Sequence, residues 1–190
     1  MSSTEVTLIP VDSLYAPGIS LMARSLFCIV DTDRAALEGL SWAATVTYGE
    51  IEDHLTTLQR QSSSSKTRLG AHLSTADHLR FCAGWIIMQC SPGTGVMRAV
   101  GLISVRQSGS GLFEIGYWVG GDARGQQVGT RAVGQLMIEL QELFPAQMRA
   151  KVRARPWEEN KASQAVLVSN GFEYVCTLFG ECFYERSIHS

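Results

Sequence analysis

The chain has 190 residues, 45% of them hydrophobic and 18% charged, which is ordinary for one globular domain with a sizeable core. Its formal net charge of -2 disfavours a generic binder of nucleic acid or of anionic membranes. Five cysteines, an odd number without a C-x-x-C pair, favour reduced thiols, and four scattered histidines give no metal-binding spacing. Without a signal-peptide pattern or a long apolar run, we expect a cytoplasmic protein.

The start of the chain predicts a lead-in, a strand and a helix. Residues 1–17 carry two prolines and predict an irregular segment. Apolar and β-forming residues over 19–30 predict the first strand. Asp31 or Thr32 can then cap a helix over 33–41.

The middle of the chain predicts a second helix and three strands. Isoleucine and leucine at helical spacing predict a helix over 48–60. The serine run within 61–66 predicts a surface loop inside the same domain. Turn-forming residues then separate three apolar segments that predict strands, at 81–90, 98–106 and 112–119.

The last third predicts two helices among three strands. Apolar residues at helical spacing predict a helix that reaches Leu143, and Pro145 ends that region. Asn160 and Gly171 are suited to begin and end a second helix. Three further strands are predicted at 148–155, 172–177 and 181–188.

A short turn with two glycines, R-G-Q-Q-V-G-T over 124–130, lies between a predicted strand and a predicted helix. The first turn of a helix has backbone N–H groups without partners, and the helix dipole adds partial positive charge there. Glycine lets the backbone approach a ligand closely. This arrangement is suited to hold a pyrophosphate, although such a turn can also serve only to end a strand.

A second block, N-K-A-S-Q-A-V-L-V-S-N-G-F, follows over 160–172. Together with E-I-G-Y-W-V over 114–119 and the turn, it resembles the GNAT superfamily of acetyl-CoA-dependent N-acetyltransferases, in particular the RimL/RimJ-type branch. The resemblance is strong over 99–186 and loose over 30–42. It implies an α/β (α+β) GNAT fold over a single domain, 1–190: a mixed, mostly antiparallel sheet of about six to seven strands with helices on both faces.

The resemblance implies acetyl-CoA as co-substrate and no metal. A backbone N–H near Val119 would polarise the acetyl carbonyl, as preorganised donors do in acyl transfer. The sequence departs from the family pattern at Gln127, where a glycine is usual; a side chain there is compatible with a helical φ and not with a positive φ. The residues implied to hold the cofactor are Trp118, Val119, Arg124, Gly125, Gln126, Gln127, Val128, Gly129, Thr130, Asn160 and Ser163.

Four residues are candidates for structural or catalytic work. Asn160 is suited to be a helix N-cap and could also contact the cofactor. Ser163 is a common first-turn serine, but in RimL-type enzymes a serine here is thought to protonate the leaving thiolate. For the general base, the resemblance favours Glu181, with Glu114 on the strand beside the acetyl group as the rival; either could instead be an exposed or pocket-shaping residue.

We therefore expect an enzyme in which a primary amine attacks the thioester directly. The acceptor implied by the branch is a protein N-terminus, and a small-molecule amine such as an antibiotic, polyamine or aminoacyl conjugate is the alternative. A non-catalytic module that binds acyl-CoA or a partner protein remains a further alternative. The resemblance is compatible with a homodimer, for which no residue argues.

Overall fold

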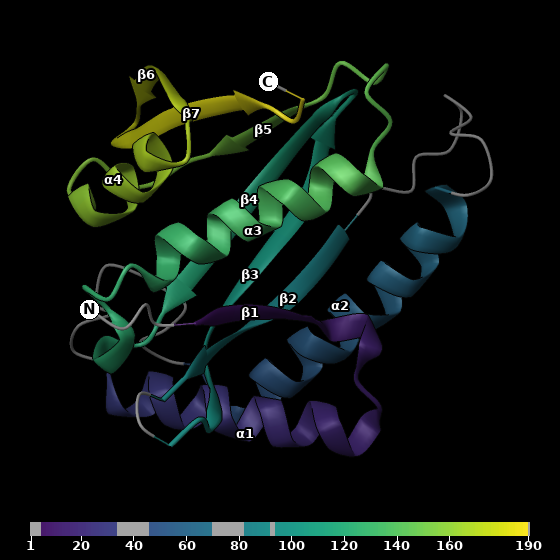
Figure 1. The fold of residues 1–190 in the computed structure, drawn as a ribbon, viewed down its shortest axis with the longest axis vertical. Helices are drawn as coiled ribbons and strands as arrows, with labels where there is room; N and C mark the ends of the chain where they lie inside the picture. Colours follow the sequence, from purple (N-terminus) through teal and green to yellow (C-terminus); the bar gives the residue numbers. More distant parts are fainter. Residues whose placement is uncertain (1–4, 34–45, 70–81, 92–93, 190) are drawn as a thin grey trace.

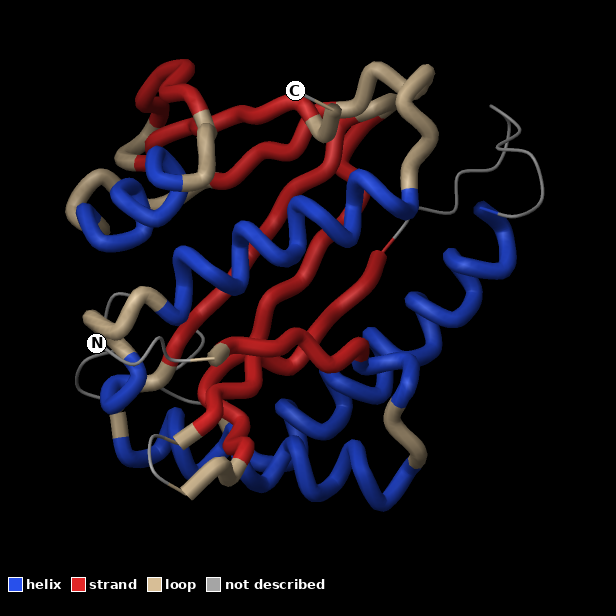
Figure 2. The backbone as a smooth tube through the Cα atoms, viewed as in Figure 1, coloured by secondary structure: helices blue, strands red, loops and turns tan. Residues whose placement is uncertain are grey.

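The computed structural model describes residues 5–33, 46–69, 82–91 and 94–189, and these build a seven-stranded sheet with helices on both faces (Figure 1). In chain order the elements are β1 Val6–Pro10, the 3-10 turn η1 Val11–Ser13, α1 Ala16–Thr32, α2 Tyr48–Leu69, β2 Cys82–Cys90, β3 Met97–Gly109, β4 Leu112–Val119, the 3-10 turn η3 Gly121–Ala123, α3 Val128–Leu143, β5 Lys151–Ala154, α4 Lys161–Ser169, β6 Glu173–Leu178 and β7 Glu181–Ser187. The tube in Figure 2 shows the same arrangement by element type.

The strands lie in the order β1-β2-β3-β4-β5-β7-β6. All neighbouring strands are antiparallel except β4 and β5, which are parallel. A parallel pair needs a crossover connection, and the chain between β4 and β5 supplies it as α3. The predicted mixed, mostly antiparallel GNAT sheet is confirmed.

Each face of the sheet carries its own apolar core. The first core packs α3 and Leu167 of α4 against one face, where inward residues of β4 such as Phe113 and Ile115 are buried. The second packs α1 and α2 against the other face, over β2 and β3. Successive strand residues point to opposite faces, so Glu114, between two residues of the first core, lies on the face opposite α3.

The beginning of the chain differs from the prediction. The segment expected to be irregular contains β1, an edge strand that pairs with β2 along its whole length and so satisfies the backbone groups on that side. The two prolines that suggested irregularity lie where they are tolerated: Pro10 ends β1, and Pro17 lies in the first turn of α1.

The strand predicted over 19–30 is wrong, because these residues form most of α1. The four buried residues are Ile19, Ala23, Leu26 and Val30, spaced for one helix face that packs against the second core. This packing outweighs the β propensity of the individual residues.

The helix expected over 33–41 is not supported at its start. Asp31 and Thr32 form the last turn of α1 instead of an N-cap, and the Thr32 hydroxyl donates back to the Cys28 carbonyl at 2.7 Å. The remaining residues of that prediction, 34–41, lie outside the described part of the chain.

The loop predicted over 61–66 is also wrong, because α2 continues to Leu69. Its start has the reciprocal capping arrangement: the Thr47 N–H donates to the Glu50 carboxylate at 2.7 Å, and the Glu50 N–H donates to the Thr47 hydroxyl at 3.3 Å. The buried face of Leu55 and Leu58 extends to Ser62, which is 1% exposed, so the first serine continues the helix face.

The other predicted elements are confirmed. The strands β2, β3, β4, β6 and β7 and the helices α2, α3 and α4 lie where the sequence placed them, although β5 covers only the centre of its predicted range. Asn160 caps α4, and Gly171 takes the left-handed conformation after it, with φ of 72°.

Candidate active site

Strands β4 and β5 part from each other toward the C-terminal end of β4. They pair over three residues, from Leu112↔Lys151 to Glu114↔Arg153. β4 then continues to Val119, whereas β5 ends at Ala154. The two strands therefore leave an opening in the sheet between them.

A cavity of about 860 Å³ lies at this opening, a size typical of a small-molecule site. Its walls come from the end of β4, the turn that leads into α3, and the segment that begins α4. Every residue predicted to hold the cofactor lines the cavity except Gln126: these are Trp118, Val119, Arg124, Gly125, Gln127, Val128, Gly129, Thr130, Asn160 and Ser163.

The turn before α3 presents open backbone donors to the cavity. Gln127 is the N-cap residue of α3, and no side chain caps the helix there. The N–H groups of Val128, Gly129 and Thr130 belong to the first helical turn, which has no partners within the helix for its N–H groups. The helix dipole places partial positive charge at the same point, so this wall of the cavity is suited to an anion.

Gln127 has the conformation that the sequence argument regarded as incompatible with a side chain. Its φ is 61° and its ψ 14°, in the left-handed region. Gly125, two residues earlier, has a φ of 72°. The chain thus keeps the backbone shape that a glycine would give, at a residue for which that shape is strained.

Arg124 and Gln126 point to neighbours on the protein. The Arg124 guanidinium donates to the Val119 carbonyl at 3.0 Å and pairs with Asp33, the last residue capping α1, at 2.6 Å. The Gln126 amide donates to the Asp122 carbonyl at 2.6 Å, and Gln126 does not line the cavity. Arg124 thus ties α1 to the cavity wall.

Ser163 lies in the first turn of α4, opposite the end of β4. Its N–H donates to the Asn160 side chain at 3.0 Å, as predicted for an N-cap. Its hydroxyl is 2.8 Å from the hydroxyl of Tyr117, and both side chains line the cavity. Burial raises the pKa of Tyr117 to about 12, against a smaller lowering by the hydrogen bond to Ser163, so the phenol stays protonated at neutral pH.

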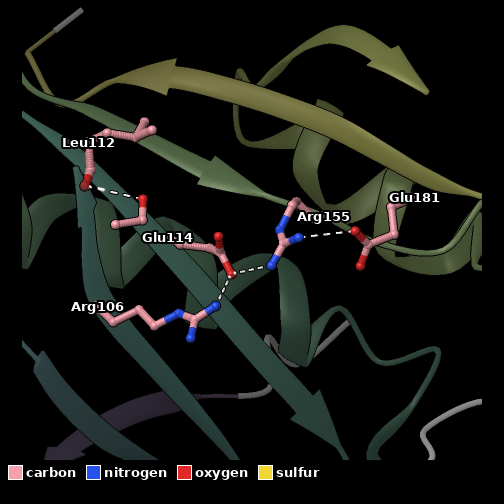
Figure 3. Close-up of polar contacts among 6 residues, drawn as sticks. Arg106, Leu112, Glu114, Arg155 and Glu181 are labelled. Carbon is pink, nitrogen blue, oxygen red and sulfur yellow. Dashed lines mark hydrogen bonds and ion pairs between the residues drawn. The ribbon is translucent and has the colours of Figure 1, made fainter. Parts of the chain in front are cut away.

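The two candidate bases are joined by one arginine (Figure 3). Arg155 donates to the Glu181 carboxylate at 3.0 Å and to the Glu114 carboxylate at 3.0 Å, and Arg106 donates to Glu114 at 2.7 Å. Burial raises the pKa of Glu114, but the hydrogen bonds from Arg155 and Arg106 outweigh it and hold the pKa below its usual value. Neither carboxylate lines the cavity: Glu114 belongs to the last pair between β4 and β5, and Glu181 begins β7.

Four residues of this region were not among the predicted site residues. Tyr117 lies on β4, and Arg155 directly follows β5. Trp157 and Glu159 line the cavity from the segment before α4. No motif marks these residues, because their roles depend on which segments the fold brings together.

No cluster of three His, Cys, Asp or Glu side chains that could hold a metal occurs among the described residues. None of the helices within the described ranges is long and apolar enough to cross a membrane.

Comparison with known proteins identifies relatives of this architecture. The acetyltransferase (GNAT) domain family matches residues 29–173. No curated protein matches the sequence significantly. Among solved structures, RimL, a ribosomal alpha-N-protein acetyltransferase in complex with coenzyme A, is 17% identical with a TM-score of 0.68, covering 100% of this chain and 96% of its own.

Two further solved structures of acetyltransferases are similar to this chain. The microcin C7 self-immunity acetyltransferase MccE, in complex with acetyl-CoA and AMP, is 16% identical with a TM-score of 0.67, covering 96% of this chain and 92% of its own. An aminoglycoside acetyltransferase in complex with coenzyme A is 17% identical with a TM-score of 0.60, covering 96% and 95%. At these identities the likeness shows a shared fold.

Proposed function

The chain belongs to the GNAT acetyltransferase family, and we propose that it is an acetyl-CoA-dependent N-acetyltransferase acting by direct transfer to a primary amine. The observation that carries the proposal is the cavity between β4 and the uncapped start of α3. Backbone donors without side-chain partners suit a pyrophosphate, and the parted strands leave room for an extended arm. Solved relatives of the same fold hold coenzyme A or acetyl-CoA.

Different parts of the site would bind the cofactor and polarise the acetyl group. The turn over 124–130 and the first turn of α3 bind the pyrophosphate through backbone N–H groups. A backbone N–H near Val119 polarises the acetyl carbonyl, which preorganised donors do with a benefit of about 3 kcal/mol each. The acceptor nitrogen bonds to the carbonyl carbon, the carbon–sulfur bond breaks, and sulfur leaves with the electron pair.

Ser163 is the proposed proton donor to that sulfur. Its hydroxyl is 2.8 Å from Tyr117, whose proton is retained because its pKa is raised to about 12. When the Tyr117 hydroxyl donates to Ser163, the Ser163 proton is left free to point into the cavity. Tyr117 is therefore a positioning residue for Ser163.

Glu181 is the proposed base, with Glu114 as the second candidate. Glu114 accepts from two arginines, and its lowered pKa makes it the weaker base. The Glu181 carboxylate accepts from one arginine, Arg155. Since neither lines the cavity, we propose that the proton of the acceptor ammonium reaches the carboxylate through water.

The proposed acceptor is a protein N-terminus, with a small-molecule amine as the alternative. The first is supported by the RimL-type motifs and by the likeness to RimL, and the second by the likeness to an aminoglycoside acetyltransferase. A non-catalytic acyl-CoA-binding module is favoured by one observation, that arginine side chains already hold both candidate bases.

Thermal unfolding against acetyl-CoA, with ATP as the control, tests the proposal. A ligand at a hundredfold excess over its dissociation constant stabilises the folded state by about 2.7 kcal/mol. We expect acetyl-CoA and free coenzyme A to raise the melting temperature and ATP to have little effect. A flat response to acetyl-CoA contradicts the proposal, and binding without acetylation across peptide and small-molecule amines supports the non-catalytic module.

A further inference from the structure

A closed ring of hydrogen bonds lies behind the turn that precedes α3. The Gln89 amide N–H donates to the Gln126 side-chain oxygen at 2.8 Å, and the Gln126 amide donates to the Asp122 carbonyl at 2.6 Å. Arg98 closes the ring by donating to the Asp122 carboxylate at 2.8 Å and to the Gln89 oxygen at 3.1 Å. None of these four residues lines the cavity.

The ring fastens the turn to the sheet. Gln89 and Arg98 are paired residues of β2 and β3, whereas Asp122 belongs to η3 and Gln126 to the turn itself. The turn therefore has a side-chain connection to a rigid element on the side away from the ligand. Gln126 makes this connection from between Gly125 and Gln127, the two residues with positive φ.

Gln89 is the buried member of the ring. It is 1% exposed, and both ends of its amide are used, one by Gln126 and the other by Arg98. A buried amide that loses a partner is costly, so the ring favours a single arrangement of its members. The Arg98–Asp122 pair is more exposed and contributes less.

The strained backbone of Gln127 suggests a function for the ring. A glycine adopts a φ of 61° without strain, but a glutamine does not, and such a conformation persists only where the surroundings impose it. The residue directly before Gln127, Gln126, holds the turn from outside the cavity through its side-chain bonds to Gln89 and Asp122.

We propose that Gln89 is a positioning residue that, through Gln126, holds the phosphate-binding turn in the shape that Gln127 disfavours. In this chain a side-chain ring anchored on the buried Gln89 replaces the glycine usually found in the turn. The ligand concerned is the pyrophosphate of coenzyme A, so the inference rests on the proposed acyl-CoA binding. Gln89 makes no contact with the ligand and acts through the backbone of residues 125–127.

Calorimetric titration of the folded protein with coenzyme A tests this role. Gln89→Met keeps the length of the side chain and removes its hydrogen bonds. We expect it to weaken coenzyme A binding about tenfold, the equivalent of one lost buried hydrogen bond. The matched control is Gln141→Met. Gln141 lies near the other end of α3, and its amide donates to the Ile188 carbonyl at 2.7 Å. The coenzyme A affinity of this variant should equal that of the natural chain.

The decisive variant is the double substitution Gln89→Met with Gln127→Gly. If the ring serves to hold Gln127, glycine at 127 should restore coenzyme A affinity to within about twofold of the natural chain, because coupled sites are not additive. A double variant that binds no better than Gln89→Met overturns the proposal, as does a Gln89→Met variant that binds like the natural chain.

Hydrogen exchange of the ligand-free protein gives a second readout. We expect faster exchange over residues 125–130 in Gln89→Met, and unchanged exchange there in Gln141→Met. If Gln89→Met does not fold, Gln126→Met opens the same ring from the exposed side and carries the same expectations. Failure of the natural chain to bind coenzyme A sinks the proposed function, whereas unchanged exchange in the ring variants sinks the role of the ring alone.

Discussion

The two sides of the opening between β4 and β5 are built in contrasting ways. On the α3 side, backbone N–H groups face the cavity without a side-chain cap, and the nearby carboxylate of Asp122 is held by Arg98. On the β7 side, the carboxylates of Glu114 and Glu181 are already paired with Arg155. The α3 side thus offers unpartnered backbone donors that suit an anion. On the β7 side, each candidate base is already paired with Arg155.

The largest expected effect comes from placing a negative charge on the α3 side of the opening. Gly129→Glu puts a carboxylate in the first turn of α3, beside the proposed pyrophosphate. The like charges should weaken coenzyme A binding by more than about 100-fold, which corresponds to about 2.7 kcal/mol. The fold should survive, since acidic residues are favourable in a first helical turn.

Gly129→Gln is the matched control, because it has the same size without the charge. Calorimetric titration of both variants separates the two causes. An equal loss in both would show that space, and not charge, decides what this wall of the cavity accepts.

A smaller effect is expected from the hydroxyl pair at the start of α4. Ser163→Ala should lower kcat about tenfold, less than the roughly hundredfold or more usual for general acid–base catalysis, because a thiol with a pKa of about 8.5 leaves without full protonation. Tyr117→Phe should lower kcat less. Since Tyr117 acts through Ser163, the double variant should be no slower than Ser163→Ala alone.

Steady-state kinetics over pH checks the same pair. With a pKa of about 12, Tyr117 stays protonated up to about pH 11, so it should add no alkaline loss of activity below that pH. Multiplicative losses in the double variant would show that the two hydroxyls act separately.

Arg155→Gln changes the base side and should cost about 1 kcal/mol of stability at pH 7. The lowered pKa of Glu114 stabilises the fold above its unfolded-state value, and this benefit disappears as the pH falls through the lower folded-state value. The difference between Arg155→Gln and the natural chain in urea unfolding should therefore shrink from pH 7 to pH 3. A difference that is equal at both pH values contradicts the pairing.

The same variant also bears on catalysis. Without Arg155 both carboxylates lose a positive partner, and the lowered pKa of Glu114 should rise, so the acid limb of the pH–rate profile should move to higher pH if Glu114 is the base. Arg106→Gln is the control, because it removes a partner of Glu114 alone. An acid limb that moves in both variants would favour Glu114, because both arginines pair with it; a limb unchanged in Arg106→Gln would contradict Glu114 as the base.

The two sides also differ in how much the sequence could predict. The turn, the N-cap Asn160 and the closing Gly171 are local signals, and the structure has them where the sequence placed them. The bridge from Glu114 through Arg155 to Glu181 joins residues 41 and 26 positions apart and depends on strand register, which no local pattern carries. The same holds for the buried amide of Gln89, 37 residues from its partner.

The wrong prediction at α1 has a different cause: the helical spacing was present in the sequence, but the β-forming residues were given more weight. The spacing of Ile19, Ala23, Leu26 and Val30 fits one helix face, yet the β-forming residues around them suggested a strand. Packing against the second core decided the outcome, and such tertiary effects override propensity.

The smallest expected effect is at Gln127 itself. Gln127→Gly should stabilise the fold by about 0.5 to 1 kcal/mol, since relief of the left-handed strain exceeds the entropy that glycine adds to the unfolded chain. For a chain of this length the melting temperature should rise by about 2 °C. Coenzyme A affinity should barely change while Gln89 is present, because the ring already imposes the required shape. Gln127→Ala keeps the strain and should leave the melting temperature where it is; an equal rise in both variants would mean that the glutamine side chain, and not its backbone, is what destabilises the turn.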